Sequence, residues 1–192
     1  MASKKIVFGG AVIVALVAAG LVFSGVLDSS YPTSAVDQGG NSPELLARGK
    51  YLAKAADCTA CHTTRNGALF AGGDALDTPF GKIYGSNITP DKEHGIGKWT
   101  SADFYRALHD GLAPNRPLYP AMPYTSYRGV TREDSDAIFA YLQSLKPVAQ
   151  PNRGNEFAFP FNLPILMRGW NVLFLKNTLP DVSSGSSQEW VR

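Results

Sequence analysis

One short motif constrains this chain more than any other feature. Residues 58–62 have the pattern C-x-x-C-H, and Cys58 and Cys61 are the two cysteines of the chain. Thiols one helical turn apart can each form a thioether with a vinyl group of the same haem, and His62 would then lie beneath the iron as its proximal ligand. The second ring nitrogen of such a histidine needs a hydrogen-bond acceptor, and the carbonyl of Pro79, or one near it, is a candidate. The motif occurs once and therefore predicts one covalently bound haem c.

Other uses of a cysteine pair fit this sequence less well. A structural zinc site normally has four Cys or His ligands. The chain has no third cysteine, and its other histidines, His94 and His109, lie 15 residues apart in loop-like and helix-like contexts. A thioredoxin-like redox pair would lie next to a βαβ pattern, and none surrounds Cys58. Haem attachment is the interpretation that we retain.

The sixth iron ligand decides what such a haem can do, because an open position binds small molecules whereas a capped one mainly transfers electrons. Met122 follows His62 by 60 residues and lies between Pro120 and Pro123. The prolines fix φ and block helix formation, so a stiff loop could present the thioether to the haem. The alternative is that Met122 fills a gap in the apolar core, as methionines often do. We expect Met122 to be the ligand. The weaker candidates are Met167, His94 and His109.

The beginning of the chain predicts export and a membrane anchor. Lys4 and Lys5 precede an uncharged stretch over residues 6–27, which Asp28 closes. As a helix this stretch would span about 33 Å, close to the roughly 30 Å of a bilayer core, and the preceding positive charges orient it with the N-terminus in the cytoplasm. The stretch is longer than the apolar region of a typical secretory signal, so an uncleaved anchor is favoured over a cleaved signal. Both alternatives place the rest of the chain outside the cytoplasm.

Helix signals dominate the part of the chain around the motif. Each has a capping residue, apolar or small residues at helical spacing and a residue that stops the helix. On the apolar face of the first, Gly49 would let another helix cross closely, or is simply tolerated there. No stretch alternates like a convincing strand. The three helices begin at Ser42, Thr100 and Thr131.

Composition supports a loop-rich fold and argues against one class of partner. Glycine (19) and proline (13) are more frequent than in an average protein. A net charge of +2 gives no support for nucleic-acid binding, which normally needs a strongly basic surface. We therefore expect a mostly α haem domain with long loops after one transmembrane helix. The expected divisions are a signal anchor over 1–28, a linker over 29–41, a monohaem domain over 42–150, and an apolar interfacial tail with a linker over 151–192.

Over residues 157–175 the tail is too apolar to be only a flexible linker. Prolines and Arg168 interrupt it, so it is not a second membrane span. In one interpretation this segment docks on a membrane or a partner subunit. In the other it folds back over its own haem domain. The sequence leaves the two open.

Longer stretches around the motif resemble a known family. With the C-x-x-C-H after a first helix and a methionine about 60 residues on, the chain resembles a class I cytochrome c. From Pro43 to Arg192 it is similar, more specifically, to the first haem domain of the cytochrome c subunits of membrane-bound dehydrogenases of the alcohol and gluconate type. The stretches that carry this similarity are FAGG (70–73), TPFGKIYGSNITPD (78–91), GIGKW (95–99), LYPAMPYTSY (118–127) and DAIFAYLQSL (136–145).

The resemblance implies both a site and a function. In that family the residues matching Cys58 and Cys61 carry the haem, and those matching His62 and Met122 are the axial ligands. It also implies electron transfer from a periplasmic dehydrogenase subunit to quinone or a terminal oxidase, by a carrier that is not itself an enzyme. Family members usually have three haem domains, whereas this chain has one C-x-x-C-H.

The leading hypothesis is therefore an electron carrier at the cytoplasmic membrane, with its haem domain on the periplasmic side. One alternative is an open-site haem c protein that binds peroxide or a diatomic gas. Another is a membrane-anchoring subunit or a fragment of a multihaem cytochrome. The sequence does not name the substrate, which would belong to the partner dehydrogenase.

Overall fold

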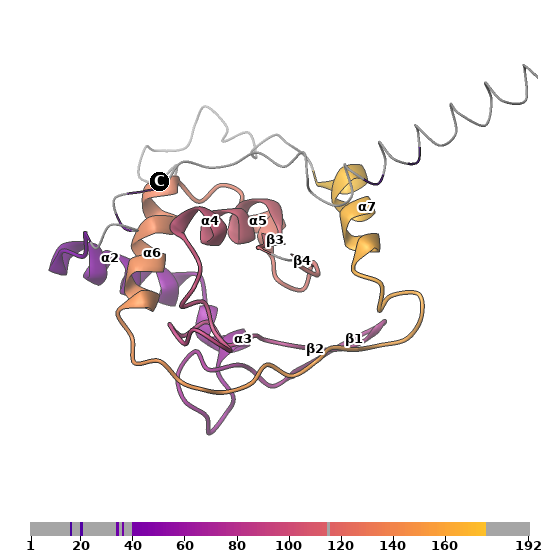
Figure 1. Cartoon of the computed structure of the whole chain (residues 1–192), viewed down its shortest axis with the longest axis horizontal. Coiled ribbons are helices and arrows are strands. Elements are labelled where there is room, and N and C mark those ends of the chain that lie inside the picture. Colours follow the sequence, from indigo (N-terminus) through magenta and orange to yellow (C-terminus); the bar gives the residue numbers. More distant parts are fainter. Residues whose placement is uncertain are drawn as a thin grey trace, which may run out of the picture.

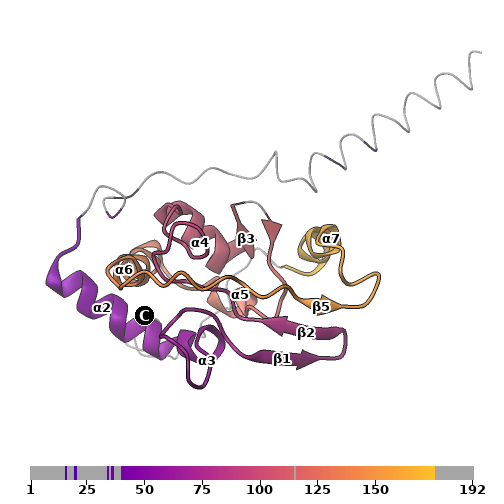
Figure 2. The same cartoon turned by 60° about the horizontal axis from the view of Figure 1, so that its bottom comes forward.

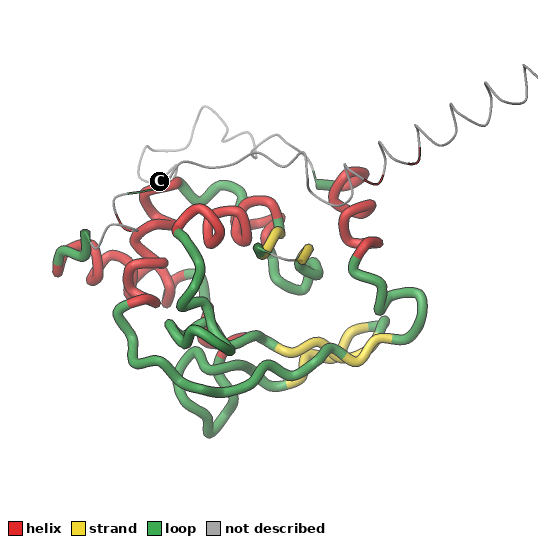
Figure 3. Tube along the Cα trace, viewed as in Figure 1, coloured by secondary structure: helices red, strands yellow, loops and turns green. Residues whose placement is uncertain are grey.

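The computed structural model describes residues 40–114 and 116–175, together with positions 16, 20, 34 and 36. Helices and loops make up most of this part of the chain, and the strands are short (Figure 3). The elements, in chain order (Figure 1), are α2 (Pro43–Ala55), α3 (Cys58–His62), β1 (Ala75–Thr78), β2 (Gly81–Tyr84), α4 (Ser101–Asp110), β3 (Leu112–Ala113), β4 (Arg116–Pro117), α5 (Tyr124–Tyr127), α6 (Arg132–Gln143), β5 (Glu156–Phe157) and α7 (Ile165–Phe174).

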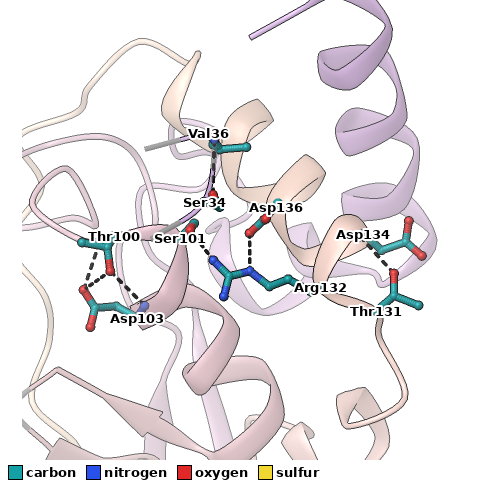
Figure 4. Close-up of polar contacts among 9 residues, drawn as sticks. All are labelled: Ser34, Val36, Thr100, Ser101, Asp103, Thr131, Arg132, Asp134 and Asp136. Carbon is teal, nitrogen blue, oxygen red and sulfur yellow. Dashed lines mark hydrogen bonds and ion pairs between the residues drawn. The ribbon is translucent and has the colours of Figure 1, made fainter. Parts of the chain in front are cut away.

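Capping side chains begin α2, α4 and α6 where the sequence predicts them. The Ser42 hydroxyl accepts a hydrogen bond from a backbone N–H of the first turn of α2. Thr100 and Asp103 form a reciprocal capping box at the start of α4 (Figure 4). The Thr131 hydroxyl accepts the backbone N–H of Asp134 at the start of α6. Since these bonds satisfy donors that a helix N-terminus leaves unpaired, they explain why the three predicted starts are confirmed.

Helices α2 and α6 cross closely because Gly49 has no side chain. A Cβ at this position would overlap the carbonyl oxygen of Ala137 on α6. Helix α4 is joined to the same helix by Arg132, whose guanidinium binds the Asp136 carboxylate and the buried Ser101 hydroxyl (Figure 4). The buried residues of the apolar core between these helices and the adjoining loops are Ala53, Phe70, Ile96, Phe104, Leu108, Ile138, Phe139 and Leu142.

The structure contains a small sheet that the sequence does not predict. Its strand order is β1-β2-β5 and both pairs are antiparallel. Strands β1 and β2 have four residues each and β5 has two, which is too short for a recognisable alternation of apolar and polar residues. Gly81 begins β2 with φ +130, and a side chain there would overlap the backbone carbonyl of Glu156. The third strand therefore depends on a glycine at this position.

The apolar segment after the predicted haem domain folds back on it. Strand β5 lies alongside β2 (Figure 2), with Phe157 opposite Gly81, and α7 contacts β4. These contacts match the interpretation in which residues 157–175 cover their own domain. The segment nevertheless leaves several large apolar side chains exposed, namely Phe159, Phe161, Leu163, Ile165, Leu166, Leu173 and Phe174.

The prediction of a membrane-spanning helix needs correction. Within the described part of the chain, no helix is long and apolar enough to cross a bilayer. The longest helix there, α2, has 13 residues, or about 20 Å at 1.5 Å per residue, and it carries charged side chains along its length. The predicted span over residues 6–27 falls mostly outside the described residues, which include only its positions 16 and 20.

Candidate haem site

The C-x-x-C-H motif forms a helix of its own. Residues 58–62 are α3, a five-residue helix, and it follows α2 after a turn in which Asp57 has φ 51. This left-handed residue redirects the chain between the two helices. Cys58 is half-buried and Cys61 is exposed, and both are free thiols. Burial raises the pKa of Cys58 to about 11, so this thiol is protonated at neutral pH.

Glycines seat the motif helix against the neighbouring backbone. A Cβ on either Gly73 or Gly85 would overlap the carbonyl oxygen of Cys61. The same two glycines are joined to each other by a hydrogen bond from the Gly73 N–H to the Gly85 carbonyl at 3.0 Å, and the Gly72 N–H donates to the His62 carbonyl at 3.0 Å. The end of α3 is therefore fixed by backbone contacts that any larger residue at these glycines would disrupt.

The imidazole of His62 is oriented by a backbone carbonyl. Its Nδ1 lies 2.6 Å from the carbonyl oxygen of Ser86. A carbonyl only accepts, so Nδ1 carries the proton and Nε2 keeps its lone pair free to bind a metal. Burial lowers the pKa of His62, against a smaller raising effect of the Ser86 hydrogen bond, which leaves the ring neutral at pH 7. The acceptor is therefore not Pro79, because the chain turns back through the β1–β2 hairpin before it reaches the imidazole.

The loop that carries the Ser86 carbonyl is fixed by the side chain of the next residue, Asn87, which is buried. The Asn87 side chain donates to the carbonyl oxygens of Val148 at 2.8 Å and Gln150 at 3.0 Å. Its Oδ1 accepts the Thr89 N–H and hydroxyl at 2.9 and 2.7 Å. Asn87 is 2 % exposed, so these bonds form without competition from bulk water. They attach the loop that orients His62 to the segment after α6.

Met122 lies in a non-helical loop immediately before α5, as its flanking prolines predict. Its backbone N–H donates to the Tyr119 carbonyl at 3.0 Å, and its own carbonyl accepts the Tyr124 N–H at 2.7 Å. The side chain of Met122 is partly buried and packs on the apolar core, as does that of Cys58. At the end of α5, Tyr127 donates to the carbonyl of Ala56, just before the motif, at 2.8 Å. The two candidate ligand segments thus meet at one core.

The other candidate ligands have different surroundings. Met167 lies on α7, outside the loops around the motif. His94 is in a turn, where its backbone N–H donates to Asp91. His109 lies at the end of α4, where its Nδ1 is 2.7 Å from an Asp110 oxygen and its ring stacks on Tyr105. In the described ranges no three His, Cys, Asp or Glu side chains gather to hold a metal ion.

The residues present fit a haem c. Two thiols lie one turn apart on a single helix, and the adjacent imidazole is neutral, with a free Nε2 and a fixed orientation. The side chain of Met122 packs on the same apolar core as that of Cys58. Sequence reasoning does not identify the supporting residues Gly73, Gly85, Ser86 and Asn87 as parts of the site. The signal that could have found them is that all four lie in two stretches that carry the family resemblance, FAGG (70–73) and TPFGKIYGSNITPD (78–91).

The fold and this site define a small c-type haem protein, and comparison with known proteins agrees. The family model for cytochrome c matches residues 46–146. The chain therefore belongs to the cytochrome c family, and membership implies a covalently bound haem c.

Known relatives place the chain near one group within this family. It is 45% identical to a nicotinate dehydrogenase subunit of Pseudomonas putida, over 84% of this chain and 14% of that protein. It is 43% identical to the gluconate 2-dehydrogenase cytochrome c subunit of Pantoea cypripedii, over 81% of this chain and 34% of that protein. With the fructose dehydrogenase cytochrome subunit of Gluconobacter japonicus it shares 41% identity, over 79% and 32% of the two chains. The resemblance to dehydrogenase cytochrome c subunits is confirmed, although the chain spans about a third or less of these relatives.

Proposed function

We propose that this chain is an electron carrier with a single haem c attached through Cys58 and Cys61 and ligated by His62 and Met122. The observation that carries the proposal is the hydrogen bond from His62 Nδ1 to the Ser86 carbonyl. It supplies the tautomer that an iron ligand requires, in a chain whose family binds haem covalently. When bound, the haem supplies a reversible one-electron change at iron, and methionine–histidine ligation gives it a comparatively high reduction potential.

The protein's part is to hold the ligands in one arrangement. The backbone contacts of Gly73 and Gly85 with the Cys61 carbonyl keep the motif helix from moving. The Ser86 carbonyl fixes the rotation of the His62 ring. A preorganised set of ligands changes little when a single electron arrives or leaves, which suits a carrier. Neither the thiols nor the imidazole has a free acid–base role in this arrangement, so we assign the chain no bond chemistry of its own.

The electron donor that we propose is a dehydrogenase subunit, and the acceptor is quinone or a terminal oxidase. The names of the relatives support this: gluconate 2-dehydrogenase and fructose dehydrogenase each have such a cytochrome subunit, and a further relative is the cytochrome c subunit of a quinone-linked alcohol dehydrogenase of Gluconobacter oxydans. We propose that the haem domain works on the periplasmic side of the cytoplasmic membrane, where haem attachment to C-x-x-C-H takes place.

The absorption spectrum of the purified holoprotein tests the ligand assignment. We expect a low-spin ferric spectrum with the methionine–iron charge-transfer band, and no carbon monoxide shift after reduction by dithionite. Met122→Ala should abolish the band and open the iron to carbon monoxide, because the sulfur ligand is gone. Met167→Ala tests the other candidate methionine ligand and should leave the charge-transfer band in place. A band that survives Met122→Ala would contradict the assignment, and carbon monoxide binding by the unmodified protein would favour an open-site haem protein instead.

A further inference from the structure

The segment around β5 and α7 contacts the Met122 loop on both of its flanks. This segment, residues 156–174, lies beyond the residues 46–146 that match the cytochrome c family. On one flank, the Tyr119 hydroxyl donates to the Phe161 carbonyl at 3.1 Å and its ring packs on Phe157, with centroids 4.6 Å apart. On the other flank, Tyr124 meets α7. We call residues 156–174 the C-terminal brace.

Tyr124 is the better anchored of these contacts. Its side chain is 0 % exposed, and its hydroxyl donates to Asn171 Oδ1 at 2.7 Å. The ring lies edge-on to Trp170, with centroids 6.4 Å apart, and on another side it closely approaches Gly111, where a Cβ would overlap the ring. A buried ring held by packing and by one hydrogen bond has little freedom to shift.

Asn171, on α7, uses both ends of its amide, one on this tyrosine and the other on the end of α4. While Oδ1 accepts from Tyr124, Nδ2 donates to the Asp110 carbonyl at the end of α4, at 3.1 Å. Rotating the amide by half a turn would place oxygen against the Asp110 carbonyl, so its orientation is determined by its surroundings. The Asn171 side chain thus ties α4, α5 and α7 together at one point.

A short path leads from this point to the candidate ligand. The backbone N–H of Tyr124 donates to the carbonyl of Met122 at 2.7 Å, and only Pro123 separates the two residues in the chain. We infer that Asn171 is a positioning residue for Met122: through Tyr124 it holds the methionine loop in the position from which Met122 would bind the haem iron. The inference rests on the proposed function, since it takes Met122 as the iron ligand.

Three variants of the full holoprotein test this role. Asn171→Ala removes the amide, and Tyr124→Phe removes one oxygen while keeping the ring that packs on Trp170. Each should weaken the methionine–iron charge-transfer band and raise the rate of carbon monoxide binding to the reduced protein by about ten-fold, the size expected for one buried hydrogen bond. Because Asn171→Ala already removes the bond that Tyr124→Phe removes, the double variant should do little more than Asn171→Ala alone. Asn155→Ala is the matched control: its side chain also bonds across to the domain, at the Tyr84 N–H, but on the strand side, and should change neither readout.

The outcomes separate the inference from the proposed function. If Met122→Ala opens the iron while Asn171→Ala and Tyr124→Phe behave like Asn155→Ala, the positioning role is wrong and the ligand assignment stands. If Met122→Ala leaves the charge-transfer band intact, the assignment itself fails. Should Asn171→Ala fold poorly, Tyr124→Phe decides the matter, because it keeps the buried ring and removes only the bond to Asn171.

Discussion

The two sides of the candidate haem site are held by different kinds of contact. On the His62 side, the backbone makes most of them: glycines against the Cys61 carbonyl, and the Ser86 carbonyl on the imidazole. On the Met122 side, a proline-flanked loop is held by tyrosine side chains that reach the C-terminal brace. Tightly packed backbone cannot move to accommodate a new side chain, whereas side-chain hydrogen bonds can be lost one at a time without disrupting the fold. We therefore expect substitutions on the first side to impair haem attachment and folding, and those on the second to loosen one ligand.

The largest effect should follow a side chain at Gly85. In Gly85→Ala the new Cβ meets the Cys61 carbonyl and lies near the Gly73 backbone, and neither can move without displacing α3. We expect a loss of about 3 kcal/mol or more in the free energy of unfolding, at the upper end for overpacked sites, with less haem incorporated. Urea unfolding and the ratio of haem to protein absorbance measure both quantities.

Gly129→Ala is the control for that substitution, because nothing lies within 4 Å of a Cβ built there. Its stability should change by less than about 0.5 kcal/mol, as for ordinary surface positions. If Gly85→Ala and Gly129→Ala had equal stability and haem content, the backbone around Cys61 would be able to shift more easily than its packing indicates. The contrast drawn between the two sides of the site would then be lost.

What the sequence predicts correctly in this fold is local. Ser42, Thr100 and Thr131 lie within three residues of the donors that they cap, so a short pattern contains the whole interaction. The C-x-x-C-H motif is equally local, and the structure gives it the helix that its spacing requires. The haem ligands themselves remain predictions that the spectra must test.

What the sequence fails to predict depends on distant partners. Ser86 orients an imidazole 24 residues earlier in the chain, and Tyr124 binds an asparagine 47 residues later. Neither contact leaves a periodic pattern, because each forms only after loops have closed. The same reason explains the missed strand β5, whose two residues are ordered by β2. The apolar run over 157–175 is conspicuous in the sequence, but only the tertiary contacts show that part of it packs on the domain while other apolar side chains of the segment stay exposed.

An intermediate effect is expected at Asn87, the buried residue behind the Ser86 carbonyl. Asn87→Ala removes the side-chain donor of the Gln150 carbonyl and one of the two donors of the Val148 carbonyl, which keeps the Gln150 N–H. It also removes the acceptor of the Thr89 N–H and hydroxyl, and we expect a cost of about 2–3 kcal/mol in unfolding free energy. The Ser86 peptide should then tilt and weaken its bond to His62, which makes the imidazole less basic and raises the reduction potential. Potentiometric titration and urea unfolding measure these changes. The charge-transfer band should survive, since Met122 is held elsewhere; a band lost here but kept in Asn155→Ala would mean that the two sides are not independent.

The smallest effect should come from the hydrogen bond that joins the two sides. Tyr127, at the end of α5, donates to the Ala56 carbonyl ahead of the motif at 2.8 Å, and Tyr127→Phe removes that bond while keeping the ring. Because Tyr127 is only partly buried, the Ala56 carbonyl can recover a bond from water, and we expect a loss of about 1 kcal/mol. Both sides of the site should be affected. We expect a slightly higher rate of carbon monoxide binding and a slightly lower unfolding free energy, both measured on the full holoprotein. Tyr51→Phe, on the exposed surface of α2, supplies the reference. If Tyr127→Phe instead loosened the methionine as much as Tyr124→Phe does, the loop would be held mainly from the motif side, and the C-terminal brace would be secondary.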